Sequence, residues 1–437
     1  MSKDRLYGWL VIASSFLAIF CLFGYRSTFA LLKGPMSAEM GWSQAQVSFG
    51  YSLMMIVYAV TAFLSGFVVD KWGARPVYVA GAVLGAAGFY VTAQVHSLLA
   101  YYVAFGVLAG VATGGLWTVS IVTVRKWFVG ATYARIWGFA FAGAPIAQVV
   151  LSLFVNDTLR GAQGTAWRGA MELLGMLTLV CMCVAAFLAK RAPEAYGMKP
   201  LGEQPQQQAA APVLAPVISA AEAYVTYPVW GAVLVFAFST LAEFLLWTQV
   251  VSYWTSDLGM SLNEATRTYV VIGAIAIFTM PLLGIVADRV VQASGAEAIG
   301  RKRMLIAGPL IGALSVVPLL LQTAAAPLLG VLFCVLFAIY WAIVPGGIVG
   351  YLGAIYGRQS IGKIYSLVSM IVMGSGPFIG PLVGGFLKDV TGGYFYSLTV
   401  SLLSFLVAAF FAATLPLLLK RSAAGESKAA SFPGVPA

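Results

Sequence analysis

The sequence predicts an all-α, polytopic membrane protein with twelve transmembrane helices in two six-helix, pseudo-symmetric halves. Of its 437 residues, 61% are hydrophobic and only 9% are charged, and the mean hydropathy is +0.91. So few charges do not cover the core of a water-soluble protein of this size. The chain also divides into long apolar runs, and landmarks of its first half recur in its second half. These observations together predict the fold class.

Twelve apolar runs predict the membrane spans, because about 20 residues of helix cross roughly 30 Å of hydrocarbon. The first half contributes runs at 8–32, 45–69, 77–95, 98–124, 133–155 and 168–189. The second half contributes runs at 229–253, 266–287, 304–321, 327–356, 364–387 and 394–418. The first run is too long for the apolar region of a cleaved signal, and no small-residue cleavage site follows it. We therefore expect it to be a retained helix.

The composition between the runs divides the chain into four parts. The two halves are predicted at 1–190 and 228–420, and a linker at 191–227 connects them. The linker is rich in Pro, Gln and Ala, which is typical of a flexible connection. The tail at 421–437 is polar, and we expect it to be disordered on the cytoplasmic side.

The two halves share three landmarks at one constant offset of 218 residues. Gly41, Gly66 and Asp70 of the first half match Gly259, Gly284 and Asp288 of the second half. A duplicated six-helix unit leaves this kind of internal repeat in a transporter sequence. The repeat therefore predicts two related halves.

The distribution of Lys and Arg predicts that both termini are cytoplasmic. Of the 25 basic residues, five fall in segments opposite the termini, namely Lys33, Arg160, Arg168, Arg267 and Lys388. Apart from these and Arg26, the remaining 19 fall on the side of the termini, which is the bias of cytoplasmic loops. We expect a bacterial-type inner or plasma membrane protein. The net charge of +10 stands in short clusters that suit anionic lipid and not nucleic acid.

The loop after the second run carries a motif. It reads Gly66-Phe-Val-Val-Asp70-Lys71-Trp-Gly73-Ala-Arg75, and the second half repeats part of it as Gly284-Ile-Val-Ala-Asp288-Arg289. The first copy resembles the loop signature of the major facilitator superfamily. The resemblance implies the major facilitator fold and a transporter that works by alternating access. It also implies a cytoplasmic gating cluster that latches the inward-closed state, made of Gly66, Asp70, Lys71, Gly73, Arg75, Asp288 and Arg289.

Segments of the first half narrow the resemblance. "YGWLVIASSFLAIF", "GYRSTFALL", "VRKWF" and "AWRGAMELLG" resemble the monocarboxylate and oxalate–formate transporters. The step from Trp9 to Arg26 also resembles the anion–cation symporters, and that resemblance implies that Arg26 contacts an anionic substrate. Tyr25 stands where that branch usually has an Asp, so the local acid is missing. The uncharged middle of the eighth run departs from the oxalate–formate pattern.

Two charged residues lie inside runs and away from their ends, Arg26 and Glu243. A charge at bilayer depth costs at least about 2.5–3.5 kcal/mol, so each is expected to face a cavity or a partner. The repeat offset pairs Glu243 with Tyr25, beside Arg26, so we expect both charges to face one central cavity from opposite halves. Arg26 would hold a carboxylate or sulfonate by a bidentate contact, and Glu243 would be the proton-coupling residue. Snorkelling of Arg26 to the outer membrane surface is the alternative.

Aromatic residues near these charges complete the expected site. Trp117 shares a helical face with Thr113 and Ser120, and Trp247 lies one turn beyond Glu243. The expected substrate-binding residues are Arg26, Tyr25, Trp117, Trp247, Tyr340 and Trp341. The glycines of "GFAFAGAP" and "GSGPFIGPLVGG" are expected to allow close helix contacts and bending.

The sequence therefore predicts a secondary active transporter that takes up a small organic anion with protons. An organic-anion exchanger, or a metabolite or drug exporter on the same fold, is the alternative. The chain contains one His, and it has no Cys–His pair and no nucleotide-binding loop, so we expect no enzyme activity, catalytic residue, metal or cofactor. The expected partners are the organic anion, protons and membrane lipid, and we expect a monomer.

Overall fold

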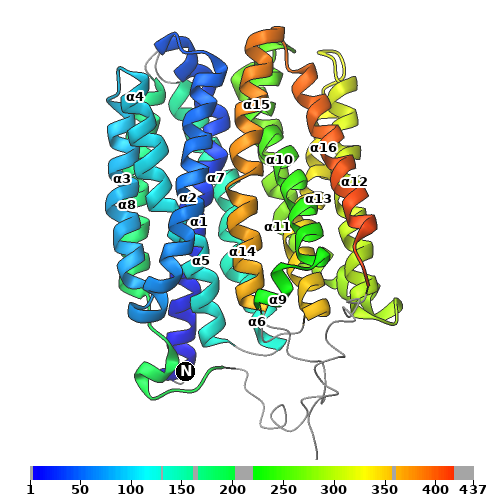
Figure 1. Ribbon diagram of the computed structural model, residues 1–437. Coiled ribbons are helices and arrows are strands. Elements are labelled where there is room, and N and C mark those ends of the chain that lie inside the picture. Colours follow the sequence, from blue (N-terminus) through cyan, green and yellow to red (C-terminus); the bar gives the residue numbers. More distant parts are fainter. Residues whose placement is uncertain (1–2, 129–130, 161–165, 202–219, 357–360, 418–437) are drawn as a thin grey trace, which may run out of the picture.

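The computed structural model describes residues 3–128, 131–160, 166–201, 220–356 and 361–417, except for the side chains at 131–135, 220, 361–363 and 366. Within these ranges the chain is helical and contains no strand, and twelve helical spans are long and apolar enough to cross a membrane (Figure 1). The predicted fold class is confirmed. Residues 202–219 of the predicted linker and the tail at 421–437 lie outside the described residues.

The first half contains six spans. Its helices are α1 (Lys3–Met40), α2 (Gln44–Trp72), α3 (Arg75–Ala93), α4 (Leu98–Tyr101), the π-helix η1 (Tyr102–Leu108), α5 (Ala109–Trp127), α6 (Ala131–Phe141), α7 (Gly143–Arg160) and α8 (Ala166–Leu188). The segments α4, η1 and α5 form one continuous span, and α6 leads into α7 within another. A short 3-10 helix, η2 (Pro193–Tyr196), follows the half.

The second half repeats this organisation after the short helix α9 (Ala220–Tyr224). Its helices are α10 (Tyr227–Ser256), α11 (Leu262–Ala293), α12 (Glu297–Leu321), α13 (Leu328–Tyr356), α14 (Ile361–Met373), α15 (Gly376–Thr391) and α16 (Phe395–Thr414). Here α14 and α15 together make the fifth span of the half.

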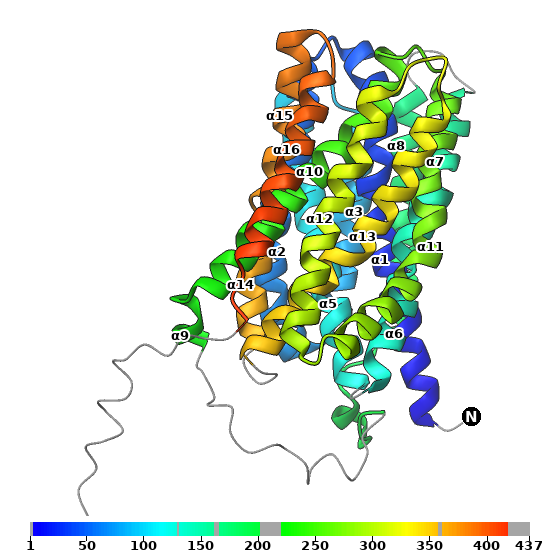
Figure 2. The same ribbon diagram turned by 90° about the vertical axis from the view of Figure 1, so that its right-hand side faces the viewer.

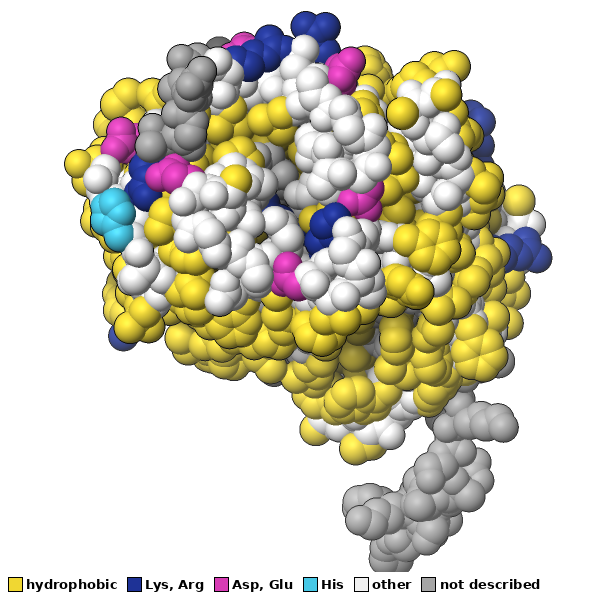
Figure 3. All heavy atoms as spheres, turned by 90° about the horizontal axis from the view of Figure 1, so that it is seen from above, with side chains coloured by type: hydrophobic (Ala, Val, Ile, Leu, Met, Phe, Trp, Pro, Cys, Tyr) yellow, Lys and Arg dark blue, Asp and Glu magenta, His cyan; other side chains and the backbone are white. Residues whose placement is uncertain are grey.

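The two halves stand side by side, and four helix pairs pack across their boundary (Figures 1 and 2). Helix α1 packs on α10, α2 packs on α14 and α15, and α7 packs on α11. The start of α1 and the end of α16 lie on one side of the bundle, here called the terminal face, and the opposite side is the far face. Seen from the far face, hydrophobic side chains cover much of the periphery, as expected of a surface that contacts lipid, and charged side chains lie both at the rim and near the middle (Figure 3).

The internal repeat is visible in local structure. Ser43 caps the N-terminus of α2 in a capping box with Gln46, and Ser261 caps α11 in the same way with Glu264. Both pairs obey the offset of 218 residues found in the sequence. Because a capping box satisfies the free N–H groups of a helix start, it fixes where the second span of each half begins.

Glycine-rich stretches break the fifth span of each half, as the sequence predicts. Helix α6 ends before Gly143, and α14 ends shortly before Gly376. A Cβ atom at Gly143 would lie 2.6 Å from the backbone oxygen of Phe16 in α1, and one at Gly376 would lie 2.7 Å from that of Ala237 in α10. Each break therefore lies where the fifth span touches the backbone of the first span of its own half.

Contacts between the halves close the far face. Asp389 of α15 accepts hydrogen bonds from the backbone N–H groups of Gln44 (3.0 Å) and Ala45 (2.7 Å), at the N-terminus of α2. Lys33 of α1 donates to the side-chain oxygen of Gln249 in α10. The sequence places Lys33 in an outer segment, and this is wrong, because α1 continues to Met40 and Lys33 is fully buried between the halves.

Candidate functional site

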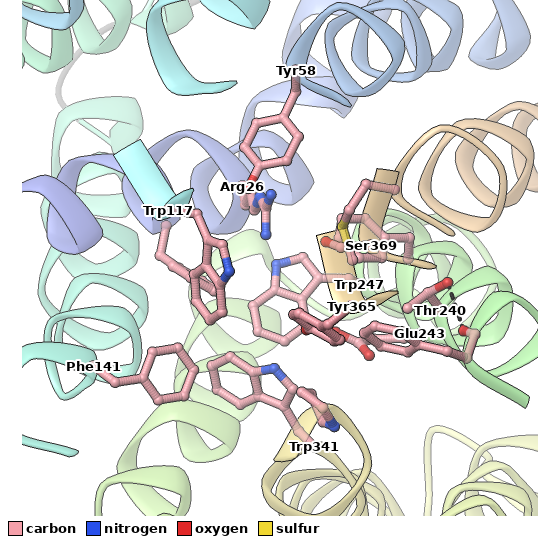
Figure 4. A pocket seen from close by; sticks show the side chains of 15 residues that line it. Arg26, Tyr58, Trp117, Phe141, Thr240, Glu243, Trp247, Trp341, Tyr365 and Ser369 are labelled. Carbon is pink, nitrogen blue, oxygen red and sulfur yellow. Dashed lines mark hydrogen bonds between the residues drawn. The ribbon is translucent and has the colours of Figure 1, made fainter. Parts of the chain in front are cut away.

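A cavity lies between the halves at the middle of the bundle, and Figure 4 shows its lining. The first half contributes Phe23, Arg26, Tyr58, Trp117 and Phe141. The second half contributes Phe236, Thr240, Glu243, Phe244 and Trp247 from α10, Trp341 and Pro345 from α13, and Tyr365, Ser369 and Met373 from α14. The empty space among them is about 680 Å3, counting the part open to solvent.

Arg26 lies in the lining with its side chain buried to all but 7%. Its guanidinium carbon stands 5.2, 4.8 and 5.5 Å from the ring centroids of Phe23, Tyr58 and Phe244. The negative ring faces stabilise the cation, but they do not replace hydrogen bonds. In the described part of the chain, neither Nε nor Nη2 of Arg26 has a hydrogen-bond partner. A buried donor without a partner is costly, so these two donors make Arg26 a candidate for contact with a ligand.

Glu243 lies in the wall that the second half contributes, and it is 8% exposed. The hydroxyl group of Tyr340 stands 3.0 Å from its Oε2 atom and 3.1 Å from the backbone oxygen of Ser239. Glu243 and Arg26 share the cavity without an ion pair between them, and the ion pairs seen among the described residues lie elsewhere. The acid and the cation are thus both available to a ligand in the cavity.

The predicted aromatic residues fall into two groups. Trp117, Trp247 and Trp341 line the cavity, where the rings of Trp247 and Trp341 meet edge to face with centroids 4.9 Å apart. Tyr340 does not line the cavity, but its hydroxyl group forms a hydrogen bond with Glu243, which does. Tyr25 also lies outside it, because its hydroxyl donates to the backbone oxygen of Gly85 in α3. Neighbouring residues of a helix point about 100° apart, so Arg26 and Tyr25 face different helices.

Sequence reasoning missed the wall that α14 contributes. Tyr365, Ser369 and Met373 follow one another at a spacing of four residues, and all three line the cavity. This spacing places them on one face of a helix, so it was a readable signal. Without a charge among them, nothing in the sequence distinguished that face from ordinary packing.

The loop motif lies at the terminal face and is bonded within the first half. Asp70 forms an ion pair with Lys126 at 2.7 Å. The carbonyl of Lys71 accepts from Arg191 at 2.6 Å, and Arg75 donates to the backbone oxygen of Ala186 at 3.1 Å. Gly73 ends α2 with a φ of 82°, and nothing lies within 4 Å of a Cβ built on Gly66.

The partial copy of this motif in the second half forms a longer ion pair than the first copy. Asp288 lies 3.7 Å from Arg301 of α12, and Arg289 is exposed on α11. No contact described here joins either copy of the motif to the opposite half, so its role as a latch stays a prediction.

Sequence comparison identifies relatives of the whole chain. The model of the Major Facilitator Superfamily matches residues 15–376. Monocarboxylate transporter 4 of Rattus norvegicus is 24% identical over 398 residues, which cover 90% of this chain and 80% of that protein. Monocarboxylate transporter 11 of Homo sapiens is 25% identical over 427 residues, with coverages of 91% and 80%.

Solved structures share the fold. A bacterial homologue of the human lysosomal transporter Spinster, inward-facing and unoccupied, superposes with a TM-score of 0.73 at 16% identity, and the match covers 95% of this chain and 98% of that one. The xylose transporter XylE from E. coli, in a partially occluded inward-open conformation, gives a TM-score of 0.68 at 13% identity, with coverages of 93% and 97%. At such identities the likeness shows the fold alone.

Proposed function

The chain belongs to the major facilitator superfamily and is therefore a membrane transporter and not an enzyme, and on that premise we propose that it takes up a small organic anion together with protons. The anion is a carboxylate or a sulfonate. The observation that carries the proposal is the buried guanidinium group of Arg26, whose Nε and Nη2 donors have no partner in the described chain. A planar anionic group satisfies two such donors at once, which a neutral or cationic ligand does not do.

The charges of the cavity support coupling to one proton. Arg26 and Glu243 are the charged residues among its described lining, so the empty site is neutral when Glu243 is ionised. A bound monoanion restores neutrality only if Glu243 takes up a proton. Because an uncompensated charge in a buried site is costly, the carrier crosses between its states either empty or with both anion and proton bound.

Tyr340 suits a carboxyl group that gains and loses a proton. Its single hydroxyl proton lies within reach of two acceptors, Oε2 of Glu243 and the backbone oxygen of Ser239. When Glu243 is ionised, Tyr340 donates to it. When Glu243 is protonated, the carboxyl group donates to Tyr340, which then donates to Ser239. Both protonation states of Glu243 keep a hydrogen-bond partner.

The contacts between the halves support alternating access to this site. Hydrogen bonds of Asp389 and Lys33 join the two halves near the far face. Transport requires these contacts to open and the terminal face to close in their place. The excess of Lys and Arg on the terminal face supports its assignment to the cytoplasm. One chain supplies the whole lining, which is consistent with a monomer.

Uptake into proteoliposomes tests the proposal. A panel of radiolabelled monocarboxylates and sulfonates is offered with and without an inward proton gradient. We expect uptake of at least one anion to follow the gradient, Arg26→Ala to abolish it, and Arg26→Lys to retain a small part. Arg267→Ala is the matched control, because Arg267 is exposed on α11 and does not line the cavity.

Normal uptake by a well-folded Arg26→Ala variant contradicts the proposal. If anion counterflow persists at full rate without a proton gradient, and the gradient drives no uptake, the protein is an anion exchanger that uses the same site and not a symporter.

A further inference from the structure

The lining of the central cavity is dominated by rings. We propose that the transported anion is a monoanion with a flat aromatic body, an inference that rests on the proposed function and names its substrate class. Nine of the 15 lining side chains are Phe, Tyr or Trp. A site for short hydroxy acids or for sugars is expected to be built mainly from polar groups that hold the hydroxyls, whereas most of this lining is aromatic or aliphatic.

The rings form walls on both halves (Figure 4). On the first half, the rings of Trp117 and Phe141 meet with centroids 5.4 Å apart and planes at 84°. On the second half, the rings of Trp341 and Trp247 meet with their centroids 4.9 Å apart. The ring of Phe23 stands 5.8 Å from Trp341, so the two walls meet. A flat aromatic ligand in the cavity gains edge-to-face and stacked contacts with these rings that an aliphatic ligand of the same size lacks.

The head group is held at one end of the cavity. Arg26 offers Nε and Nη2, and the indole Nε1 of Trp247 also has no hydrogen-bond partner among the described residues. Trp247 is 4% exposed and Arg26 is 7% exposed, so each side chain is more than nine-tenths buried. In Figure 4 the indole nitrogen is turned toward the side of the cavity that holds Arg26. A guanidinium group and a neutral N–H together suit one carboxylate.

The rest of the cavity disfavours a second charge or many hydroxyl groups on the ligand. The hydroxyl of Thr240 already donates to the backbone oxygen of Phe236 at 2.9 Å. With Glu243 protonated, Arg26 balances one anionic group of the ligand, and a second one would leave an uncompensated negative charge in the buried site. The substrate therefore carries one anionic group.

Binding of four matched probes to the full chain in proteoliposomes tests the inference. The probes are 3-phenylpropionate, 3-cyclohexylpropionate, lactate and the neutral 3-phenylpropionamide. We expect 3-phenylpropionate to bind about 10-fold or more tightly than lactate, and about 2- to 10-fold more tightly than the cyclohexyl analogue, the factor expected for ring contacts beyond buried area. The amide is expected to bind at least about 10-fold more weakly than 3-phenylpropionate, because it lacks the charge.

Variants separate the contribution of the walls from that of the head-group contacts. Trp341→Leu is expected to weaken 3-phenylpropionate about 10-fold and to leave lactate within about 2-fold, whereas Trp341→Phe restores most of the loss. Trp247→Phe keeps a ring but removes the N–H, so it is expected to weaken all three anions by a similar factor of about 10. Trp230→Leu is the control, because Trp230 is 45% exposed on α10 and lies outside the cavity.

The outcomes distinguish this inference from the proposed function. If lactate binds as tightly as 3-phenylpropionate, and Trp341→Leu does not change the ratio of their affinities, the inference of an aromatic substrate is wrong. The proposed symport of an organic anion is not affected by that result. If none of the three anions binds and none is transported together with protons, the proposed function is wrong, and so is the inference of an aromatic substrate.

Discussion

Lys33 of α1 donates a hydrogen bond to the side-chain oxygen of Gln249 in α10, and this contact joins the two halves of the transporter although Lys33 is fully buried. The amide nitrogen of Gln249 in turn donates to Ser48 at 3.4 Å and to the backbone oxygen of Pro381 at 3.0 Å. The Lys33 nitrogen also stands 5.6 Å from the centroid of the Tyr394 ring, but Gln249 is its hydrogen-bond partner and also holds α2 and α15. Opening of the far face has to separate this contact.

Gln249→Leu is expected to favour the state in which the far face is open. It leaves the Lys33 ammonium buried without its acceptor, which costs about 3 kcal/mol in the closed state only. A maleimide that does not cross the membrane should then label a cysteine placed at Ser48 about 100-fold faster, in a background with the four native cysteines replaced by Ser.

The double variant Lys33→Met with Gln249→Leu is expected to label slowly again, because no unpaired charge is left to bury. Lys388→Met is the control, since Lys388 pairs with Asp257 at 2.7 Å within the second half. Equal labelling rates for Gln249→Leu and the parent protein would show that the contact does not hold the far face.

Tyr340→Phe is expected to slow proton-coupled uptake about 10-fold at unchanged expression. The ring still fills its place, but Glu243 loses the hydroxyl group that serves both of its protonation states. Initial uptake rates under a fixed proton gradient measure the effect. Tyr351→Phe, in the same helix, removes a hydroxyl that donates to the backbone of Pro416 far from the cavity, and its rate should match the parent.

Glu243→Gln is expected to separate anion movement from proton movement. The amide mimics the protonated acid permanently, so the charge of a bound anion is balanced at every pH. Counterflow of labelled anion should persist, while gradient-driven accumulation and its pH dependence disappear. Glu172→Gln is the control, because Glu172 is exposed on α8 and bonds to Gln94. Accumulation by Glu243→Gln at the parent level would exclude Glu243 as the proton site.

Transport of a monoanion is expected to be electroneutral. One proton on Glu243 and one anion at Arg26 carry no net charge, so a potassium diffusion potential of either sign should leave the uptake rate unchanged. Proteoliposomes with valinomycin provide this measurement, and a pH electrode gives the stoichiometry of one proton per anion. A rate that follows the potential contradicts the charge balance derived from the lining.

Asp70→Asn is expected to slow transport several-fold with little change in thermal stability. The pair with Lys126 is largely exposed, at 72% for the Asp side chain, so it contributes at most about 1 kcal/mol to folding. A role in closing the terminal face would therefore appear in rate and not in Tm. Asp157→Asn, which removes another exposed pair with Arg160, is the control for both measurements. A parent-level transport rate in Asp70→Asn would remove the gating role.

The candidate site was partly readable from the sequence. A charge in an apolar run is expensive wherever the helix lies, so Arg26 and Glu243 stand out without any structure. The repeat offset also placed both near one cavity, and the structure brings them there. Tyr25 shows the limit of this reasoning, because the offset fixes depth along the helix and not the direction in which a side chain points.

The sequence by itself determined the membrane class, the number of spans and the internal repeat. These properties depend on the free energy of transfer into lipid and on local caps, which act over a few turns of one helix. The tertiary structure alone decided that Lys33 is buried, that Tyr340 stands behind Glu243 and that α14 completes the cavity wall. Each of these depends on how helices rotate and pack against partners distant in the chain. Apolar residues cover nearly every face of a membrane helix, so its own sequence leaves that rotation undetermined.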